Sequence, residues 1–260
     1  MSDNELIHEE RDGIVTVTLN RPEARNALTF AMYRSLESIC ETVPTDGSVK
    51  AIIITGAGEK AFAAGTDMTQ FRGFKTEQDA LDYEHNMGTV YTAVERCKVP
   101  TIAAISGACT GGGAGIAAAC DLRITNANLK FGFPIARTLG NCLSIANLSR
   151  LSAIIGPARV KDVIFTARLV GAEEALALGL VSEVLPDHDT LMARANEIAS
   201  NIAKLAPLTL RATKEGLRRL RTEGPEARDD DLILMTYMSE DFREGMEAFL
   251  GKRKPEFKGR

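Results

Sequence analysis

The sequence has no apolar run that reaches the roughly 18 residues needed to cross a membrane. Its acidic start, MSDNELIHEE, lacks the basic and apolar regions of a secretory signal. The net charge of -4, with basic residues dispersed apart from the last few, gives no reason to expect nucleic acid or an anionic membrane as a partner. We therefore expect a cytoplasmic enzyme whose partners are small molecules and protein subunits.

The cysteines show no spacing typical of a disulfide framework or of a zinc site. There are five, an odd number, and none forms a CxxC pair. We expect no bound metal and interpret all five as buried thiols: Cys40, Cys97, Cys109, Cys120 and Cys142.

Two phosphate-binding motifs are also absent, although the chain has a glycine-rich stretch, TGGGAGIAAACD. Gly111 and Gly113 are spaced as in the dinucleotide motif G-x-G-x-x-G, but Ile116 stands where the third glycine is required. The Walker pattern G-x-x-x-x-G-K-[ST] does not occur. The glycines therefore need another explanation.

Strands alternate with helices through most of the chain, which predicts an α/β fold. Residues 13–19 alternate as a half-buried strand, and a turn and an earlier strand are expected before them. Two continuous apolar runs, at 49–58 and 99–107, are typical of strands covered on both faces. An amphipathic helix is predicted over 79–97, and short strands at 122–125 and 180–185.

The character of the sequence changes near residue 206, so we divide the chain into a core at 1–205 and a helical region at 206–260. Residues 231–253 are predicted to be helical with more apolar side chains than one stripe needs, which suggests a second buried face against another subunit. These side chains are Leu232, Ile233, Leu234, Met235, Tyr237, Met238, Phe242, Met246 and Phe249.

Two loops follow the two apolar strands: FAAGTDM, at 62–68, and GACTGGG, at 107–113. If the strands are neighbours, both loops lie at one rim and each can offer a backbone N–H to a single oxygen, which is an oxyanion hole. Alternatively, the glycines only allow a helix to pack closely on a strand. Spacing alone leaves both interpretations open.

Six segments in order resemble the crotonase superfamily, the enoyl-CoA hydratases and isomerases: LNRPEARNAL, FAAGTDM, ISGACTGGGAGIAAACDLRI, FGFP, ALALGLVSEV and REGMEAFLGKRKPEFKGR. The resemblance implies a spiral of ββα units with a C-terminal α-helical trimerisation region, assembled as a homo-trimer or hexamer. It also implies an acyl-CoA thioester as ligand, with no separate cofactor because CoA is part of the substrate. By the same resemblance, the N–H groups of Thr66 and Gly112 would form the oxyanion hole for a thioester enolate.

The resemblance further implies a set of substrate-binding residues. Lys252 is physically plausible among them because an ammonium group near a phosphate is favourable, although the basic C-terminus can also be only a solvated tail. Asp67 can equally be a turn or helix cap. The set is Ala24, Arg25, Ala64, Gly65, Asp67, Met68, Gly111, Phe249 and Lys252.

One departure from the family pattern concerns proton transfer. By the resemblance, hydratases carry glutamates at the positions of Gly115 and Ile135, and neither of these residues can act as an acid or a base. Asn141 and Ser144, near the second position, could bind a ligand or water, but both residue types are common in turns. His85 is an acid/base candidate because of its residue type, although its helical angle places it roughly opposite the apolar stripe of its helix.

We therefore interpret the chain as an acyl-CoA enzyme of the enoyl-CoA hydratase/isomerase family with an atypical acid/base set. A decarboxylase, hydrolase or isomerase acting on an unusual acyl group is the alternative among enzymes, because related folds exchange reactions by changing pocket residues. A non-catalytic acyl-CoA-binding subunit is the alternative from another class.

Overall fold

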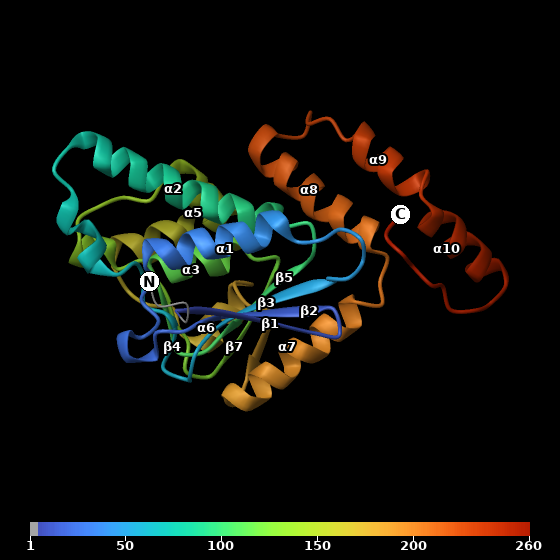
Figure 1. Cartoon of the computed structure of the whole chain (residues 1–260). Coiled ribbons are helices and arrows are strands. Elements are labelled where there is room, and N and C mark those ends of the chain that lie inside the picture. Colours follow the sequence, from blue (N-terminus) through green and yellow to red (C-terminus); the bar gives the residue numbers. More distant parts are fainter. Residues whose placement is uncertain (1–4) are drawn as a thin grey trace.

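The computed structural model describes residues 5–260 and is built on a six-stranded sheet with the strand order β1-β2-β3-β5-β7-β9 (Figure 1). The first two strands form an antiparallel hairpin, and the other neighbours are parallel. Asp12 and Gly13 make the hairpin turn, both with positive φ. The strands are β1 (Leu6–Arg11), β2 (Ile14–Leu19), β3 (Ala51–Gly56), β5 (Thr101–Ile105), β7 (Leu122–Asn126) and β9 (Glu183–Leu185).

A second, three-stranded parallel sheet has the order β4-β6-β8. Its strands are β4 (Ala61–Ala63), β6 (Ala108–Thr110) and β8 (Lys130–Gly132). Three successive parts of the chain therefore repeat one unit: a strand of the large sheet, a strand of the small sheet and then a helix. This repetition confirms the spiral of ββα units.

The large sheet is covered on both faces, as the continuous apolar runs predict. Alternate residues of a strand point to opposite faces. Ile52 and Ile54 pack in the main core, whereas Ile53 belongs to a second core that contains Leu191 and Ala195 of α7 (His188–Ile202). Figure 1 accordingly shows α7 on the side of the sheet opposite to α1, α2 and α3.

The helices over the main core are α1 (Phe30–Thr42), α2 (Glu77–Arg96), α3 (Gly112–Ala119) and α5 (Ile145–Phe165). The predicted helix at 79–97 is confirmed as α2, and a capping box between Thr76 and Asp79 fixes its start. Short elements complete this part of the chain: the 3-10 helices η1 (Pro22–Ala24) and η2 (Met68–Gly73), and the α-helices α4 (Ile135–Thr138) and α6 (Ala172–Ala177).

The last 55 or so residues form α8 (Pro207–Glu223), α9 (Asp230–Tyr237) and α10 (Glu240–Leu250), which extend away from the sheet (Figure 1). The helix predicted over 231–253 is in fact two helices, because Ser239 leaves the helical path and its hydroxyl caps the N-terminus of α10. Much of the apolar surface predicted here is exposed in the single chain, including Tyr237 and Met238. The boundary between residues 205 and 206 stays a prediction.

Four of the five cysteines are buried as expected, but Cys142 is exposed because it lies in the loop between α4 and α5. Within residues 5–260, no group of three His, Cys, Asp or Glu side chains could hold a metal ion. None of the helices in that range has the length and apolar character of a membrane span. The cytoplasmic location stays a prediction.

Candidate active site

The two loops singled out in the sequence lie side by side, at the ends of the paired strands β4 and β6. The Thr110 hydroxyl donates a hydrogen bond of 3.0 Å to the carbonyl of Ala64. A β-carbon built on Gly111 would lie 3.5 Å from the Cα of Gly65, so the two backbones are nearly in contact. The small sheet, which the sequence analysis did not predict, therefore brings the loops together.

The three consecutive glycines are required for different reasons. Gly111 has a φ of +52°, a conformation that favours glycine. A β-carbon on Gly112 would overlap the hydroxyl of Tyr33, and one on Gly113 would lie 2.5 Å from the carbonyl oxygen of Ala63 in β4. Close packing of a helix on a strand thus explains Gly113, whereas Gly112 faces the loop that contains Thr66.

Two backbone N–H groups beside the cavity, those of Thr66 and Gly112, are candidates to bind an oxygen atom. Gly112 is the first residue of α3, where N–H groups have no partner within the helix and the helix dipole favours negative charge. Within residues 5–260, no backbone hydrogen bond outside the helices and strands is donated by the N–H of Gly112 or Thr66. A β-carbon on Gly112 would lie 3.2 Å from the Thr66 hydroxyl, so the two residues are neighbours. This arrangement can hold a developing oxyanion.

A cavity of about 310 Å³ opens beside these loops. The lining combines both loops with one face of α2 and with the segment from Phe133 to Asn147. The residues of α2 that line it are Tyr83, Glu84, Met87 and Tyr91.

Hydrogen bonds to two tyrosine hydroxyls hold the first loop in place through Thr66. The Thr66 hydroxyl is 2.9 Å from the hydroxyl of Tyr33 and 2.9 Å from that of Tyr83. Burial raises the pKa of both tyrosines, so both stay protonated at neutral pH. Tyr33 was missed in the sequence; the signal is a phenol on the buried face of a helix, where its hydroxyl needs a hydrogen-bond partner.

The side chain of Tyr91 occupies the space beside Gly115. A β-carbon on Gly115 would lie 2.6 Å from Tyr91 Cζ and 2.7 Å from its hydroxyl oxygen. Burial raises the pKa of Tyr91 well above its usual range. Ile135 stands at the second position where the resemblance implies a glutamate in hydratases. It is buried and lines the cavity with an apolar side chain. Neither position places a carboxyl group in the cavity.

Glu84 is the only carboxylate among the described residues that line the cavity. It lies on α2 three residues before Met87 and seven before Tyr91, so it shares their helix face. Half-burial raises its pKa above the ordinary value of 4.5. Glu84 is not among the residues predicted from the sequence, although its spacing from Met87 and Tyr91 is visible there.

Of the three other acid/base candidates, only Asn141 lines the cavity, from the exposed loop before α5. The Ser144 hydroxyl caps α5 by accepting a hydrogen bond of 3.4 Å from the N–H of Asn147. His85 is exposed on the far side of α2 and is not among the residues that line this cavity. Ser144 and His85 are therefore not brought to the loops.

The predicted substrate-binding residues near the first loop are brought together. The N–H of Ala64 donates to the carbonyl of Arg25, which ties the turn containing Ala24 to the loop. Gly65, Met68 and Gly111 line the cavity together with Ala64.

Asp67 does not line the cavity. Its carboxylate caps η2 by accepting hydrogen bonds from the N–H and hydroxyl of Thr69, and it forms an ion pair of 2.9 Å with Arg21. These contacts lower the pKa of Asp67. They agree with the cap that the sequence offered as an alternative role.

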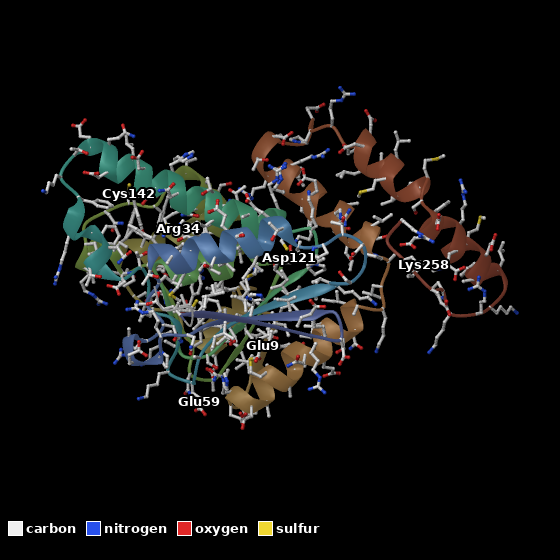
Figure 2. The ribbon with its side chains drawn as sticks, in the orientation of Figure 1. Glu9, Arg34, Glu59, Asp121, Cys142 and Lys258 are labelled. Carbon is white, nitrogen blue, oxygen red and sulfur yellow. The ribbon has the colours of Figure 1, made fainter. Side chains whose placement is uncertain are left out.

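Phe249 and Lys252 are not brought to the cavity by their own chain. They lie in and just after α10, which projects from one end of the molecule. Figure 2 labels Cys142, which lines the cavity, and Lys258, which follows α10, on opposite sides of the molecule. Phe249 is 84% exposed, so α10 leaves its outer face uncovered.

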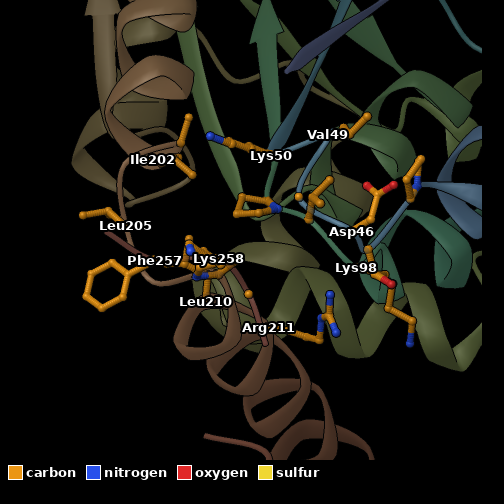
Figure 3. A pocket seen from close by; sticks show the side chains of 18 of the residues that line it. Asp46, Val49, Lys50, Lys98, Ile202, Leu205, Leu210, Arg211, Phe257 and Lys258 are labelled. Carbon is orange, nitrogen blue, oxygen red and sulfur yellow. The ribbon is translucent and has the colours of Figure 1, made fainter. Parts of the chain in front are cut away.

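A second cavity, of about 380 Å³, lies between the C-terminal tail and the core (Figure 3). It has Ile202 and Leu205 on one side and Asp46 and Lys98 on the other. No residue of the two glycine-containing loops lines it, so it offers no N–H pair to an oxyanion.

Comparisons with known proteins agree with this architecture. The family model described as Enoyl-CoA hydratase/isomerase matches residues 9–260. A short-chain-enoyl-CoA hydratase of Clostridium acetobutylicum is 34% identical, covering 99% of both chains. A 2,3-dehydroadipyl-CoA hydratase of Escherichia coli is 33% identical, covering 99% of this chain and 100% of the relative.

A solved structure agrees as well. The crystal structure of an enoyl-CoA hydratase/carnithine racemase from Magnetospirillum magneticum is similar with a TM-score of 0.90 at 34% identity, covering 100% of this chain and 97% of that one. The match therefore extends over the sheets, the two loops and the C-terminal helices. The chain belongs to the enoyl-CoA hydratase/isomerase family of the crotonase superfamily.

Proposed function

We propose that this protein binds an acyl-CoA thioester and stabilises its enolate with the backbone N–H groups of Thr66 and Gly112. The observation that carries the proposal is the pairing of β4 with β6, which brings Thr66 and Gly112 together in the lining of one cavity. Removing one oxyanion-hole donor typically costs about 2.7–4 kcal/mol of transition-state stabilisation, so two preorganised donors account for a large share of a rate enhancement.

The acid/base set is proposed to differ from that of a two-glutamate hydratase. The relatives named above are hydratases by name. In this chain, the space beside Gly115 is filled by the phenol of Tyr91, and Ile135 offers only an apolar side chain. Addition of water to a double bond needs both a base and an acid, each worth roughly 10²–10⁴ in rate. We therefore expect enolate chemistry without efficient hydration.

The substrate carries its own CoA, so the proposed reaction needs no separate cofactor. The turn at Ala24 and Arg25 and the loop from Ala64 to Met68 lie together and are proposed to hold the CoA. Because α10 lies away from the cavity, Phe249 and Lys252 could contact a bound CoA only from a second copy of the chain. This geometry, with the exposed apolar side chains of α9 and α10, supports a homo-trimer or hexamer.

Exchange of the α-proton tests the proposal. Butanoyl-CoA is incubated with the protein in D₂O, and deuterium in the acyl group is followed by mass spectrometry. We expect exchange at the α-carbon, because enolate formation is reversible. Binding of the thioester without exchange would contradict the proposal and favour a non-catalytic acyl-CoA-binding subunit.

A parallel assay follows hydration of crotonyl-CoA through the loss of its conjugated absorbance, beside a hydratase that carries both glutamates. Slow or undetectable hydration is expected. A turnover number within tenfold of the control would contradict the atypical acid/base set.

A further inference from the structure

We propose that Glu84 is the catalytic base of the cavity and removes the α-proton of a thioester held by Thr66 and Gly112. This inference rests on the proposed function. In the step, a carboxylate oxygen of Glu84 takes the proton from the α-carbon, and the C–H electron pair forms the carbon–carbon double bond of the enolate. The carbonyl π pair moves to the thioester oxygen, where the two N–H groups stabilise it. Return of a proton from Glu84 to the α-carbon completes the cycle.

The helix geometry places Glu84 in the wall of the cavity. Residues at i, i+3 and i+7 share one helix face, and Glu84, Met87 and Tyr91 all line the cavity. Tyr91 is the side chain that fills the space beside Gly115. Glu84 therefore lies on the same face of α2 as the side chain that fills the space beside Gly115.

The turn of α2 that carries Glu84 is anchored to the loop that contains Thr66. Its neighbour Tyr83 is hydrogen-bonded to the Thr66 hydroxyl at 2.9 Å. The ring of Tyr83 also packs against Phe71 and Phe74, with centroid distances of 4.8 and 5.9 Å. The residue that anchors this turn of α2 therefore contacts the residue whose N–H is proposed to hold the substrate oxygen.

The carboxylate of Glu84 is free to accept a proton. Within residues 5–260, no hydrogen bond or ion pair engages it. Its half-burial without a partner is unfavourable for the charged form, which is the usual origin of a carboxyl pKa shifted towards neutrality. A base with a raised pKa is stronger and better matched to the weakly acidic α-proton.

The other titratable groups in or near the cavity are unsuited to the role. The phenols of Tyr83 and Tyr91 have raised pKa values and stay protonated. Cys142 is exposed to solvent in the loop after α4, so it is not held at a fixed place in the cavity. Asp67 lies outside the cavity lining, with its oxygens engaged by Thr69 and Arg21.

The experiment compares Glu84→Gln, which keeps the shape and removes the base, with the wild type and with Glu77→Gln. Glu77 is an exposed carboxylate in the first turn of the same helix. Deuterium exchange into butanoyl-CoA measures proton abstraction, and calorimetry measures binding of the same thioester. We expect Glu84→Gln to lower the exchange rate about 10²-fold or more while binding changes less than threefold. Glu77→Gln should match the wild type in both.

The pH profile separates a base from a structural residue. A carboxylate acts as a base only when deprotonated, so wild-type exchange should fall as the pH drops through a pKa above 4.5. Glu84→Asp should keep this acidic limb at a lower rate, and Glu84→Gln should lose it. Because burial makes the charged form unfavourable in the folded state, Glu84→Gln should be as stable as the wild type, or more stable, at pH 7.

Two outcomes overturn the inference in distinguishable ways. If the wild type and Glu84→Gln exchange at rates within threefold of each other, Glu84 is not the base and the proposed function remains. If the wild type binds butanoyl-CoA and exchanges no proton, the proposed function fails and the role of Glu84 fails with it.

Discussion

Replacing Gly115 by alanine should destabilise the protein, although alanine is the better helix former. Gly115 lies in the interior of α3, where an exchange of glycine for alanine normally stabilises by about 0.5–1 kcal/mol. Here the added β-carbon would lie 2.6 Å from Cζ of Tyr91, a residue that is only 4% exposed. The added atom therefore requires the ring to swing towards the cavity that it lines, or one of the two helices to shift.

The magnitude follows from these two opposing effects. Overpacking of a core lowers the free energy of unfolding by roughly 1–3 kcal/mol. The helix preference of alanine offsets about 0.5–1 kcal/mol of this loss. A contact of 2.6 Å to a ring carbon is shorter than real β-carbon contacts, so one of these shifts is unavoidable. We expect Gly115→Ala to lower the free energy of unfolding by about 1–2 kcal/mol.

A double-mutant cycle gives the sharpest test. In a Tyr91→Ala background the ring is gone, so Gly115→Ala should become stabilising by about 0.5–1 kcal/mol. Gly88 is the matched control, because it is also helical and a β-carbon there meets nothing within 4 Å. Gly88→Ala should stabilise in both backgrounds.

Urea unfolding at one fixed protein concentration measures all the variants, since an oligomer's stability depends on concentration. If Gly115→Ala stabilises the wild type as Gly88→Ala does, Tyr91 does not fill the space beside Gly115. The reasoning about that position would then be refuted.

Two further predictions concern assembly and CoA binding. Because α9 and α10 expose a large apolar surface, light scattering at micromolar concentration should give three or six times the mass of the chain, and a monomer would contradict the proposed assembly. Lys252→Glu should weaken binding of a CoA thioester, measured by calorimetry, because the new carboxylate repels the phosphates. Lys254→Glu, two residues away, should have a smaller effect. Equal affinity of Lys252→Glu and the wild type would remove Lys252 from the site.

The sequence predicted the large sheet and its helices because their apolar patterns are long. The apolar run that contains Ile52 to Ile54 predicted a strand covered on both faces, and the stripe that contains Met87 predicted an amphipathic helix. The small sheet was missed because each of its strands has only three residues, too few to show a period. The break at Ser239 was missed because the apolar residues continue on both sides of it.

The candidate site, too, was predicted only in part from the sequence. The glycine loops were found because glycine marks backbone conformations and close contacts, as at Gly111 and Gly113. The tyrosine that fills the space beside Gly115 could not be found by reading along one segment, since Tyr91 comes from another helix. Glu84 was missed for a related reason: a glutamate at the edge of an apolar stripe is usually a solvated residue, and only the cavity shows what it faces.

A crystal structure of the protein with a bound acyl-CoA thioester tests the central claim most directly. The account predicts that the thioester oxygen lies about 2.7–3.1 Å from the backbone nitrogens of both Thr66 and Gly112, with the α-carbon facing the carboxylate of Glu84. A thioester bound in this cavity with its oxygen away from both nitrogens, or bound only in another part of the molecule, would contradict it.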